Sequence, residues 1–409
     1  MTDRCAVNSA TIRAVEDNWQ TNIQQLNCNL HPLETITKEC KKVLKQHEKE
    51  NKFPARQCYG TDCFAGNLVL KSNQLRYKDS TGDPRLFKSR LQSANLPSNL
   101  LPRFRVARMH ITHQISRVLL EHEEFFTKLF ADKQLKSSQL RSAVHLDFAR
   151  KEVKVELQVL RVIGKAITGP WMKYFYDDET SELHHFDAFE LVKKSIGNIQ
   201  QWADDPLSVF SGTVDCFGDE MTMGDCLGTL PDNKILFTSM LSDCFKRTVT
   251  VLNRQYSNYF SLNIDDKLKE ETRSAKVHNI YAEQIMGMFS AMKALKTNAT
   301  VDYISCAIRA RKNHAVNYLM NMNEEDREEL MTKARQFARK DRVFKRKTQK
   351  ALEDEIRRRY EVKVQKGVDA DHRKLVNQLK KGKRTTADFP EQKEMKKIYT
   401  VHIHCSSHE

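Results

Sequence analysis

Glu283 is the acidic residue with the most unusual setting, because it stands alone in an apolar stretch. No other charged residue occurs between Lys276 and Lys293. The surrounding apolar residues have the spacing of a packed helix capped by Asn279: Ile280, Met286, Phe289 and Met292. An ionised carboxylate avoids such surroundings unless something pairs with it. Glu283 is therefore either a structurally paired acid or a ligand of a metal ion.

Cys28 and His31 are the second group that could do chemistry. They are three residues apart in Asn27-Cys-Asn-Leu-His-Pro-Leu33, so a helix would place them on one face. Two such ligands are half of a zinc site. The candidate partners are Cys58 with Cys63, or the C-terminal set His402, His404, Cys405 and His408. The alternative is a packed cysteine and a hydrogen-bonded histidine.

An arginine-aromatic motif lies between Leu101 and Met109. Its members are Arg103, Phe104, Arg105 and Arg108. The arginines could grip phosphates while the ring stacks on a base. The alternative is the start of a helix, with Pro102 near the first position and solvated arginines.

The net charge of +15 is concentrated near the C-terminus. Residues 333–384 hold 20 Lys and Arg against 7 Asp and Glu, whereas the preceding residues are close to neutral. Such a block attracts nucleic acid without reading its sequence, although a solvated helix without a partner is the alternative. The cluster 380–384 also fits a nuclear localisation signal. The residues expected to contact DNA here are Lys345, Arg346, Lys347, Lys380, Lys381, Lys383 and Arg384.

With 9 Pro and 13 Gly in 409 residues, the composition favours a mostly helical protein. Apolar periodicity predicts helices over 33–50, 106–130, 139–168, 185–203, 233–260 and 324–366. The helix over 139–168 is expected to end at Thr168-Gly-Pro170, and residues 204–232 are expected to form a loop-rich connection. The last helix carries a thin apolar seam, which either pairs with a second copy in a homodimer or packs on its own domain.

Two classes of protein are not expected from this sequence. The start, Met-Thr-Asp-Arg-Cys, is not a signal peptide, and no apolar run approaches 18 residues. A soluble intracellular protein without a membrane partner is therefore expected, and its 10 cysteines are expected to be reduced thiols.

Taken in order, the motifs resemble the catalytic half of hAT-superfamily DNA transposases. They are Asp3, the Cys28-x2-His31 pair, Arg103-Phe104, a long helical block, and Asn279-x3-Glu283. The resemblance implies a mainly α chain: a partial ribonuclease-H-like α/β core, interrupted by a large all-helical insertion and followed by a long basic helix. The implied parts are 1–27 (core), 28–270 (insertion), 271–320 (the returning segment with the catalytic Glu), 321–384 (basic tail) and 385–409 (disordered).

The same resemblance implies roles for individual residues. Asp3 and Glu283 match the second and third acids of an Asp-Asp-Glu triad that binds two Mg²⁺ or Mn²⁺ ions. Phe104 takes the place of the family's Trp, and Gln284 that of an Arg. The family's first Asp and its BED zinc finger have no counterpart here. Two-metal catalysis needs both ions clamped, so weak metal binding and little or no catalysis are expected.

The sequence therefore predicts a transposase-derived, DNA-binding nuclear protein that is catalytically inactive, with no small-molecule substrate. One alternative is a non-catalytic helical nucleic-acid-binding or scaffold protein in which Glu283 is structural. Another is an active metal nuclease whose missing acid is Asp17 or Asp62.

Overall fold

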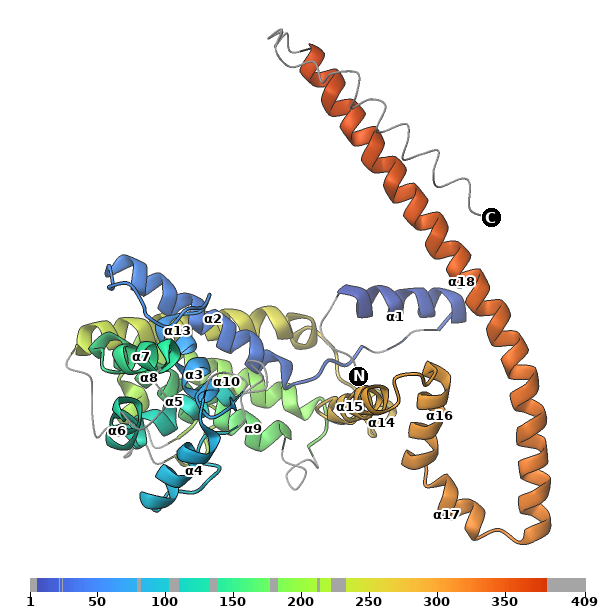
Figure 1. The fold of residues 1–409 in the computed structure, drawn as a ribbon, viewed down its shortest axis with the longest axis horizontal. Helices are drawn as coiled ribbons and strands as arrows, with labels where there is room; N and C mark the ends of the chain where they lie inside the picture. The colour runs from blue at the N-terminus through green and yellow to red at the C-terminus, as the bar shows by residue number, and fades with distance from the viewer. Residues whose placement is uncertain are drawn as a thin grey trace. The chain divides into compact units, whose positions relative to one another are not determined.

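The computed structural model describes residues 6–21, 23, 25–78, 82–102, 110–132, 138–176, 183–211, 214–221 and 233–380. Its contacts divide the chain into two compact units, Met1–Ala291 and Met292–Glu409. Figure 1 shows the first unit as a cluster of packed helices and the second as a few helices that include one very long one.

The prediction of a mainly α protein is confirmed. No β-strand occurs among the described residues, and β structure there is limited to isolated bridges such as that between Val214 and Glu220. Residues assigned to a ribonuclease-H-like core instead contain helix α1 (Ala6–Trp19). The expected mixed α/β core is therefore not supported over the described part of the chain.

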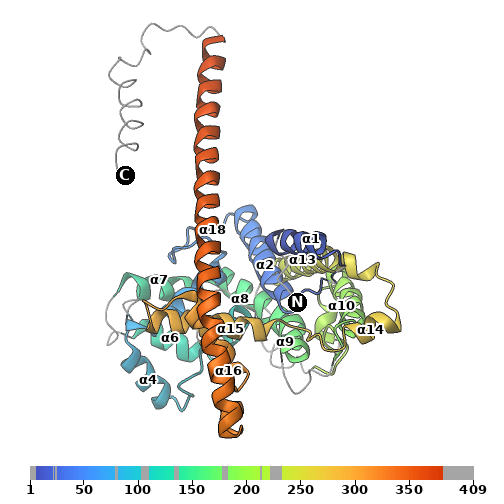
Figure 2. The same cartoon turned by 90° about the vertical axis from the view of Figure 1, so that its right-hand side faces the viewer.

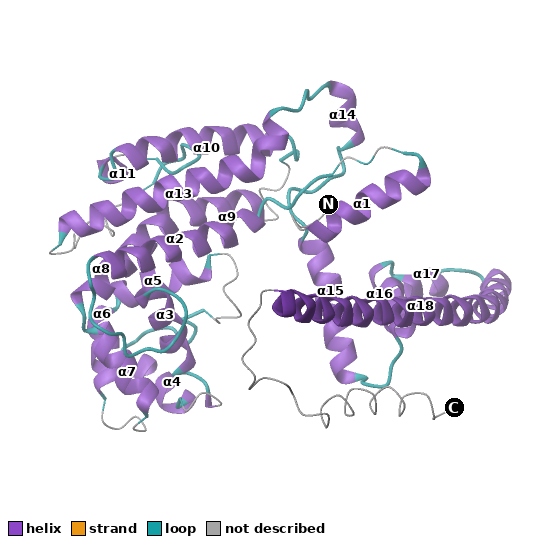
Figure 3. Cartoon of the chain, turned by 90° about the horizontal axis from the view of Figure 1, so that it is seen from above, coloured by secondary structure: helices purple, strands orange, loops and turns teal. Residues whose placement is uncertain are grey.

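Three long helices form the largest layer of the first unit. Helix α13 (Lys234–Phe260) packs along α2 (His31–Glu50) and along α10 (Asp187–Asp204), as Figure 3 shows. Its buried residues recur with helical period, which fits a helix enclosed on two sides. They are Leu236, Phe237, Met240, Leu241, Cys244, Phe245, Thr248, Val249, Val251, Leu252, Tyr256 and Tyr259.

The second layer of this unit is built from shorter helices. Helix α5 (Ile111–Glu121) packs on α8 (Lys151–Ile163), and α3 (Phe64–Gln74) packs on α5, α7 (Gln139–Phe148) and α8. Helix α6 (Glu123–Ala131) packs on α7, and α4 (Pro84–Ser93) begins at the N-cap Asp83. Rings from α6 and α7 meet edge to face, with the Phe130 and Phe148 centroids 5.4 Å apart.

The helix expected to end before Pro170 instead continues through it. The chain breaks at Ala149-Arg150, and α8 then leads into a π-helical turn (η2, Gly164–Thr168) and α9 (Gly169–Tyr176). Pro170 has no N–H, so it cannot bond the Ala166 carbonyl four residues back. That carbonyl accepts a hydrogen bond from the Cys216 amide at 3.0 Å instead. The loop 214–221 is thereby fixed to the π-turn.

The chain after α13 carries small helices. Helix α14 (Asp266–Glu271) is followed by α15 (Ile280–Leu295), which holds Glu283 in its first turn. The packed stripe expected for α15 is wrong, because the helix buries none of its residues and Met286 is 64% exposed. Periodicity identified the helix, but it did not show whether another element covers that face.

The second unit contains α16 (Val301–Lys312), α17 (Ala315–Met320) and α18 (Glu324–Lys380). Figure 2 shows α18 as one uninterrupted helix. Its 57 residues correspond to about 85 Å at a rise of 1.5 Å per residue. The predicted end at residue 366 was too early by about four turns.

Two general features apply to both units. None of the helices in the described part of the chain combines the length and apolar composition that crossing a bilayer requires. The cysteines that the structure describes are free thiols, and all of them except Cys306 are buried.

Candidate functional site

Helix α18 is rich in basic residues between positions 333 and 350. This segment holds nine Lys and Arg and a single acid, Asp341. Lys, Arg, Gln, Glu and Ala are good helix formers, and the acids of the first turn suit the positive end of the helix dipole. The Asn323 side chain caps that end by accepting the Asp326 amide at 2.8 Å. Helix propensity and the N-cap therefore favour this helix even where none of its faces is buried.

Six of the nine cations have no carboxylate partner among the described residues. At 100° per residue they fall within an arc of about 160° on one side of the helix. All six side chains are exposed to solvent. They are Arg339, Lys340, Arg342, Arg346, Lys347 and Lys350. We call this set the basic face.

Lys345 lies outside the basic face. Its ammonium group contacts Asp341 at 2.8 Å and Asp302 of α16 at 3.2 Å. Hydrogen bonds to both carboxylates raise the pKa of Lys345. Of the three adjacent residues expected to contact DNA, Arg346 and Lys347 therefore remain available, whereas Lys345 ties α18 to α16.

Other predicted DNA contacts fall outside the described structure. These are Arg103, Phe104, Arg105 and Arg108, together with Lys381, Lys383, Arg384 and the side chain of Lys380. The structure describes the residues just before the first motif. There the Pro102 carbonyl accepts a hydrogen bond from the Asn73 side chain at 2.7 Å.

Glu283 is a half-buried side chain, not an acid enclosed by apolar neighbours. Water can therefore reach its charge, so burial alone does not force Glu283 to bind a metal ion. Asp3, its expected companion, lies outside the described residues. Of the two acids that were candidates to complete a triad, Asp62 pairs with Lys41 at 2.8 Å and Asp17 lies on α1.

Side chains that could hold a metal gather at one place among the described residues. Glu48, Cys63 and Glu156 bring ligand atoms within 4.8 Å of one another, and neither Glu283 nor Cys28 and His31 belong to the group. The Mg²⁺ or Mn²⁺ site that the resemblance implies also needs Asp3, so it stays a prediction. His402, His404, Cys405 and His408 lie outside the described structure.

The Glu48, Cys63 and Glu156 group caps a helix. The Phe64 and Ala65 amides donate to Glu48 and Glu156, each at 2.7 Å, and the Gly66 amide donates to the Cys63 sulfur at 3.3 Å. These amides are the first N–H groups of α3, where the helix dipole is positive and disfavours a cation. Burial and the nearby Glu48 raise the pKa of Glu156 well above 4.5, which favours the protonated form of Glu156.

The Cys28 to His31 segment is a structural junction. The Asn27 amide donates to the Tyr259 hydroxyl at 2.9 Å, and the Asn29 carbonyl accepts from the Trp171 indole at 2.7 Å. The Tyr256 hydroxyl donates to the Asn29 side-chain oxygen at 2.7 Å. The asparagines beside Cys28 thus join α9 and α13, a role that cysteine–histidine spacing could not predict.

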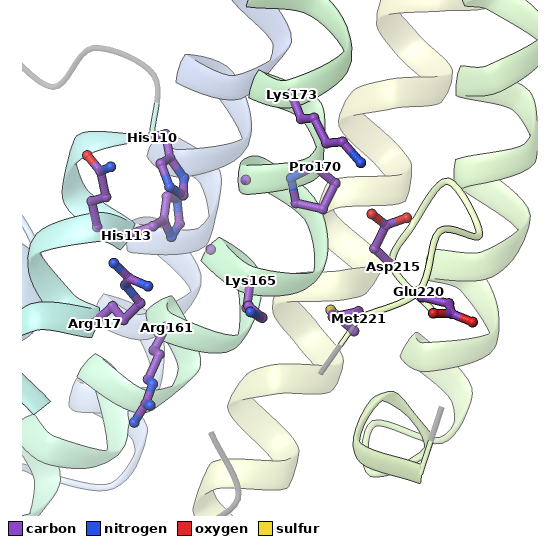
Figure 4. A pocket seen from close by; sticks show the side chains of 13 residues that line it. His110, His113, Arg117, Arg161, Lys165, Pro170, Lys173, Asp215, Glu220 and Met221 are labelled. Atoms are coloured by element: carbon purple, nitrogen blue, oxygen red, sulfur yellow. The ribbon is translucent and has the colours of Figure 1, made fainter. Parts of the chain in front are cut away.

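A polar cavity of about 430 Å³ lies beside the π-turn, and the sequence analysis did not anticipate it. Figure 4 shows side chains from α5, the π-turn, α9 and the loop 214–221 around it. The sequence signal was present in Gly164 and the Gly169-Pro170 pair, which interrupt a helical pattern. π-turns often accompany functional sites because they displace one turn of a helix.

The comparisons with known proteins add no family to these observations. No protein-family model matches the chain, and no curated protein or solved structure is significantly similar to it. Function is therefore inferred from the charges and contacts of this chain.

Proposed function

We propose that the protein binds DNA through the phosphate backbone, and that the basic face of α18 is its main contact. The observation that carries the proposal is the set of six exposed cations, 339–350, without a carboxylate partner among the described residues. Cations that already pair with neighbouring acids gain less from a phosphate, because they must first give up that partner. Unpaired cations on one side of a helix have no such cost.

The dimensions of the basic face suit a duplex. Residues 339–350 span about 17 Å of helix, which equals roughly five base pairs of DNA. The major groove admits an α-helix, and contacts to phosphates require no particular base sequence. Binding of this kind releases counterions and weakens steeply as the salt concentration rises.

Descent from a hAT-type transposase is the finer part of the proposal. It is supported by the order of the motifs and by the position of Glu283 in the first turn of a helix that follows Asn279. A catalytic role is not part of the proposal, because no described carboxylate joins Glu283 in a metal-binding group. A nuclear location is proposed from the cluster 380–384.

A charge-matched pair of variants tests the DNA contact. One variant replaces three residues of the basic face, Arg346→Gln, Lys347→Gln and Lys350→Gln. The control replaces Arg357, Arg358 and Arg359 with Gln, which removes the same charge from guanidinium groups that pair with Asp354 or Glu355. Binding of both to a fluorescent 20-base-pair duplex is measured by anisotropy over a series of salt concentrations.

The basic-face variant should lose about tenfold or more in affinity, and the slope of log K against log salt should fall by about 2 to 3. The control should lose less affinity and keep more of the slope. Equal losses in the two variants would mean that only the net charge matters, and would contradict a role for this face. A wild-type protein that does not bind the duplex at low salt would contradict the proposal as a whole.

A further inference from the structure

The cavity beside the π-turn has one strongly cationic wall. Arg117 from α5, Arg161 from α8 and Lys165 from the π-turn all line it, and Figure 4 shows them on the same side. Arg161 and Arg117 approach one oxygen of Glu121, at 3.5 and 3.8 Å. Two guanidinium groups thus converge on one carboxylate among the described residues.

Lys165 adds a third charge to this wall. Its side chain is half-buried, and the described residues supply no carboxylate within ion-pair distance of it. A partly desolvated ammonium group favours an anion close by. The wall therefore combines two planar guanidinium groups with one ammonium group. Proteins use both kinds of donor to bind phosphate.

Two acids on the opposite side of the cavity already have hydrogen-bond or ion-pair partners. Asp215 accepts hydrogen bonds from the Phe217 and Asp219 amides, at 2.8 and 3.1 Å. Asp219 in turn pairs with Lys173 at 3.3 Å. Of the lining acids, Glu220 alone is exposed. These contacts hold Asp215 and Asp219 to partners of their own, so the acids of this side compete little for the cations of the opposite wall.

The floor of the cavity is rigid and uncharged. His113 is held on both sides, with Nδ1 2.9 Å from the Leu160 carbonyl and Nε2 3.0 Å from the Thr37 hydroxyl. His110 Nδ1 lies 2.7 Å from the Thr168 hydroxyl. Burial lowers the pKa of both imidazoles, to about 4 for His110 and about 3 for His113. Both rings are therefore neutral at physiological pH and fixed in direction.

We propose that this cavity binds the phosphate group of a small phosphate monoester, with Arg117, Arg161 and Lys165 as the residues that hold it. A monoester carries close to two negative charges at neutral pH, which suits a wall on which three cations lie close together. Its three terminal oxygens accept hydrogen bonds from different directions, as donors from three separate turns require.

The cavity is larger than a phosphate ion needs. Its 430 Å³ lies within the range of small-ligand pockets, so the organic part of the ligand has room beside the phosphate. Pro170, Met221 and the face of His110 are the less polar surfaces that line this space. The ligand class is therefore a phosphorylated small molecule with a modest apolar portion, and this site is distinct in sequence and unit from the basic face of α18.

Calorimetric titration of the full chain tests the site with three probes: inorganic phosphate, phenyl phosphate and dimethyl phosphate. Phenyl phosphate is a monoester dianion with an apolar ring, whereas dimethyl phosphate is a singly charged diester like the DNA backbone. We expect phenyl phosphate to bind most tightly, inorganic phosphate less tightly, and dimethyl phosphate most weakly. Phenyl phosphate should bind at least about tenfold more tightly than dimethyl phosphate, because it carries the second negative charge.

The variants Lys165→Gln and Arg117→Gln should each weaken phenyl phosphate about tenfold or more. Their controls are Lys193→Gln on α10 and Arg254→Gln on α13, which remove an exposed charge of the same kind elsewhere in the unit. Thermal melting of each apo variant checks that the fold is kept. The triple variant of the basic face should bind phenyl phosphate as the wild type does, so the two proposals fail separately.

Three outcomes would overturn the site. The first is no measurable binding of phenyl phosphate at millimolar concentration. The second is binding that Lys165→Gln and Arg117→Gln leave unchanged while they still fold. The third is equal binding of dimethyl phosphate that is lost in the basic-face variant, which would assign the phosphate contact to DNA.

Discussion

Lys345 of α18 lies 3.2 Å from the carboxylate of Asp302 in α16, and the same ammonium group lies 2.8 Å from Asp341 one turn earlier in α18. The lysine that stands beside Arg346 and Lys347 in the sequence therefore faces a different direction and has different partners. Adjacent residues of a helix are 100° apart, so one basic triplet divides between two sides.

Single substitutions should separate these neighbours in DNA binding. Arg346→Gln and Lys347→Gln should each reduce the salt slope by about 1, because each removes one phosphate contact. Lys345→Gln should leave the slope close to that of the wild type, since its charge already faces two carboxylates. Anisotropy titrations at four or more salt concentrations measure all three. A loss with Lys345→Gln equal to that with Arg346→Gln would show that the triplet acts as undivided charge.

The sequence predicted the long helices because each of them has either a periodic apolar face or a strongly helix-forming composition. Helix α13 was placed within a residue or so of its limits, at 233–260 against Lys234–Phe260. The end at Pro170 was wrong for a physical reason. A proline in a helix normally leaves a carbonyl unpaired, and here the Cys216 amide, 46 residues later in the sequence, satisfies it.

The candidate sites were harder to predict, because charge and metal-ligand spacing do not reveal which partners the fold supplies. The basic block was visible in composition, but its division between Lys345 and the basic face required Asp302. The asparagines around Cys28 bond to residues more than 140 positions away, such as Trp171 and Tyr256. Contacts at that separation carry no local signal in a single sequence.

Gly164 is expected to be essential for the close approach of α5 to the π-turn. A Cβ added there would lie 2.8 Å from the Cβ of His113, which is held by two hydrogen bonds and cannot withdraw. Gly164→Ala should therefore lower the free energy of unfolding by about 1 to 3 kcal/mol, as overpacking does. Denaturant titration measures the change.

Gly197→Ala is the matched control for that substitution. Gly197 lies inside α10, and a Cβ there would meet nothing within 4 Å. Because alanine is the better helix former, this variant should be more stable than the wild type by about 0.5 to 1 kcal/mol. If both variants were stabilised, α5 would have room to move away from the π-turn, and the tight contact would be wrong.

Metal-dependent cleavage of DNA is expected to be absent. A two-metal reaction needs carboxylates that clamp both ions, and Glu283 belongs to no group of three or more possible metal ligands among the described residues. Incubation of supercoiled plasmid with the protein and Mg²⁺ or Mn²⁺ should give no nicking above a protein-free control. Nicking that Glu283→Gln abolishes would show that Glu283 is catalytic. It would also require a second metal-binding acid outside the described residues.

Two buried groups should give the stability of the first unit opposite dependences on pH. Because the folded pKa of Glu156 is raised, the folded state holds a proton that the unfolded state releases above about pH 4.5. The stability that this proton contributes is present below that pH and is lost as pH rises through the folded pKa. Glu156→Gln keeps an uncharged hydrogen-bonding group in place, so it should flatten the decline in stability on the alkaline side.

His113 should act in the other direction. Its pKa falls to about 3 in the folded protein against an ordinary 6.5. Between these pH values the unfolded state therefore binds a proton that the folded state does not bind. Stability from this group is complete above about pH 6.5 and is lost progressively as pH falls toward 3. His113→Gln keeps a side chain that can bond the Leu160 carbonyl, and it should reduce the loss of stability on the acid side.

Urea titrations of the wild type and of both variants at pH 4.5, 6.0, 7.5 and 9.0 separate the two effects. The Glu156→Gln curve should depart from the wild type increasingly as the pH rises above about 4.5, and the His113→Gln curve as the pH falls below about 6.5. Both variants could be less stable overall, but only the slopes with pH report titration. Slopes identical to that of the wild type would mean that neither group changes its protonation on folding. That result would remove the protonated acid from the cap of α3 and the neutral imidazole from the floor of the cavity.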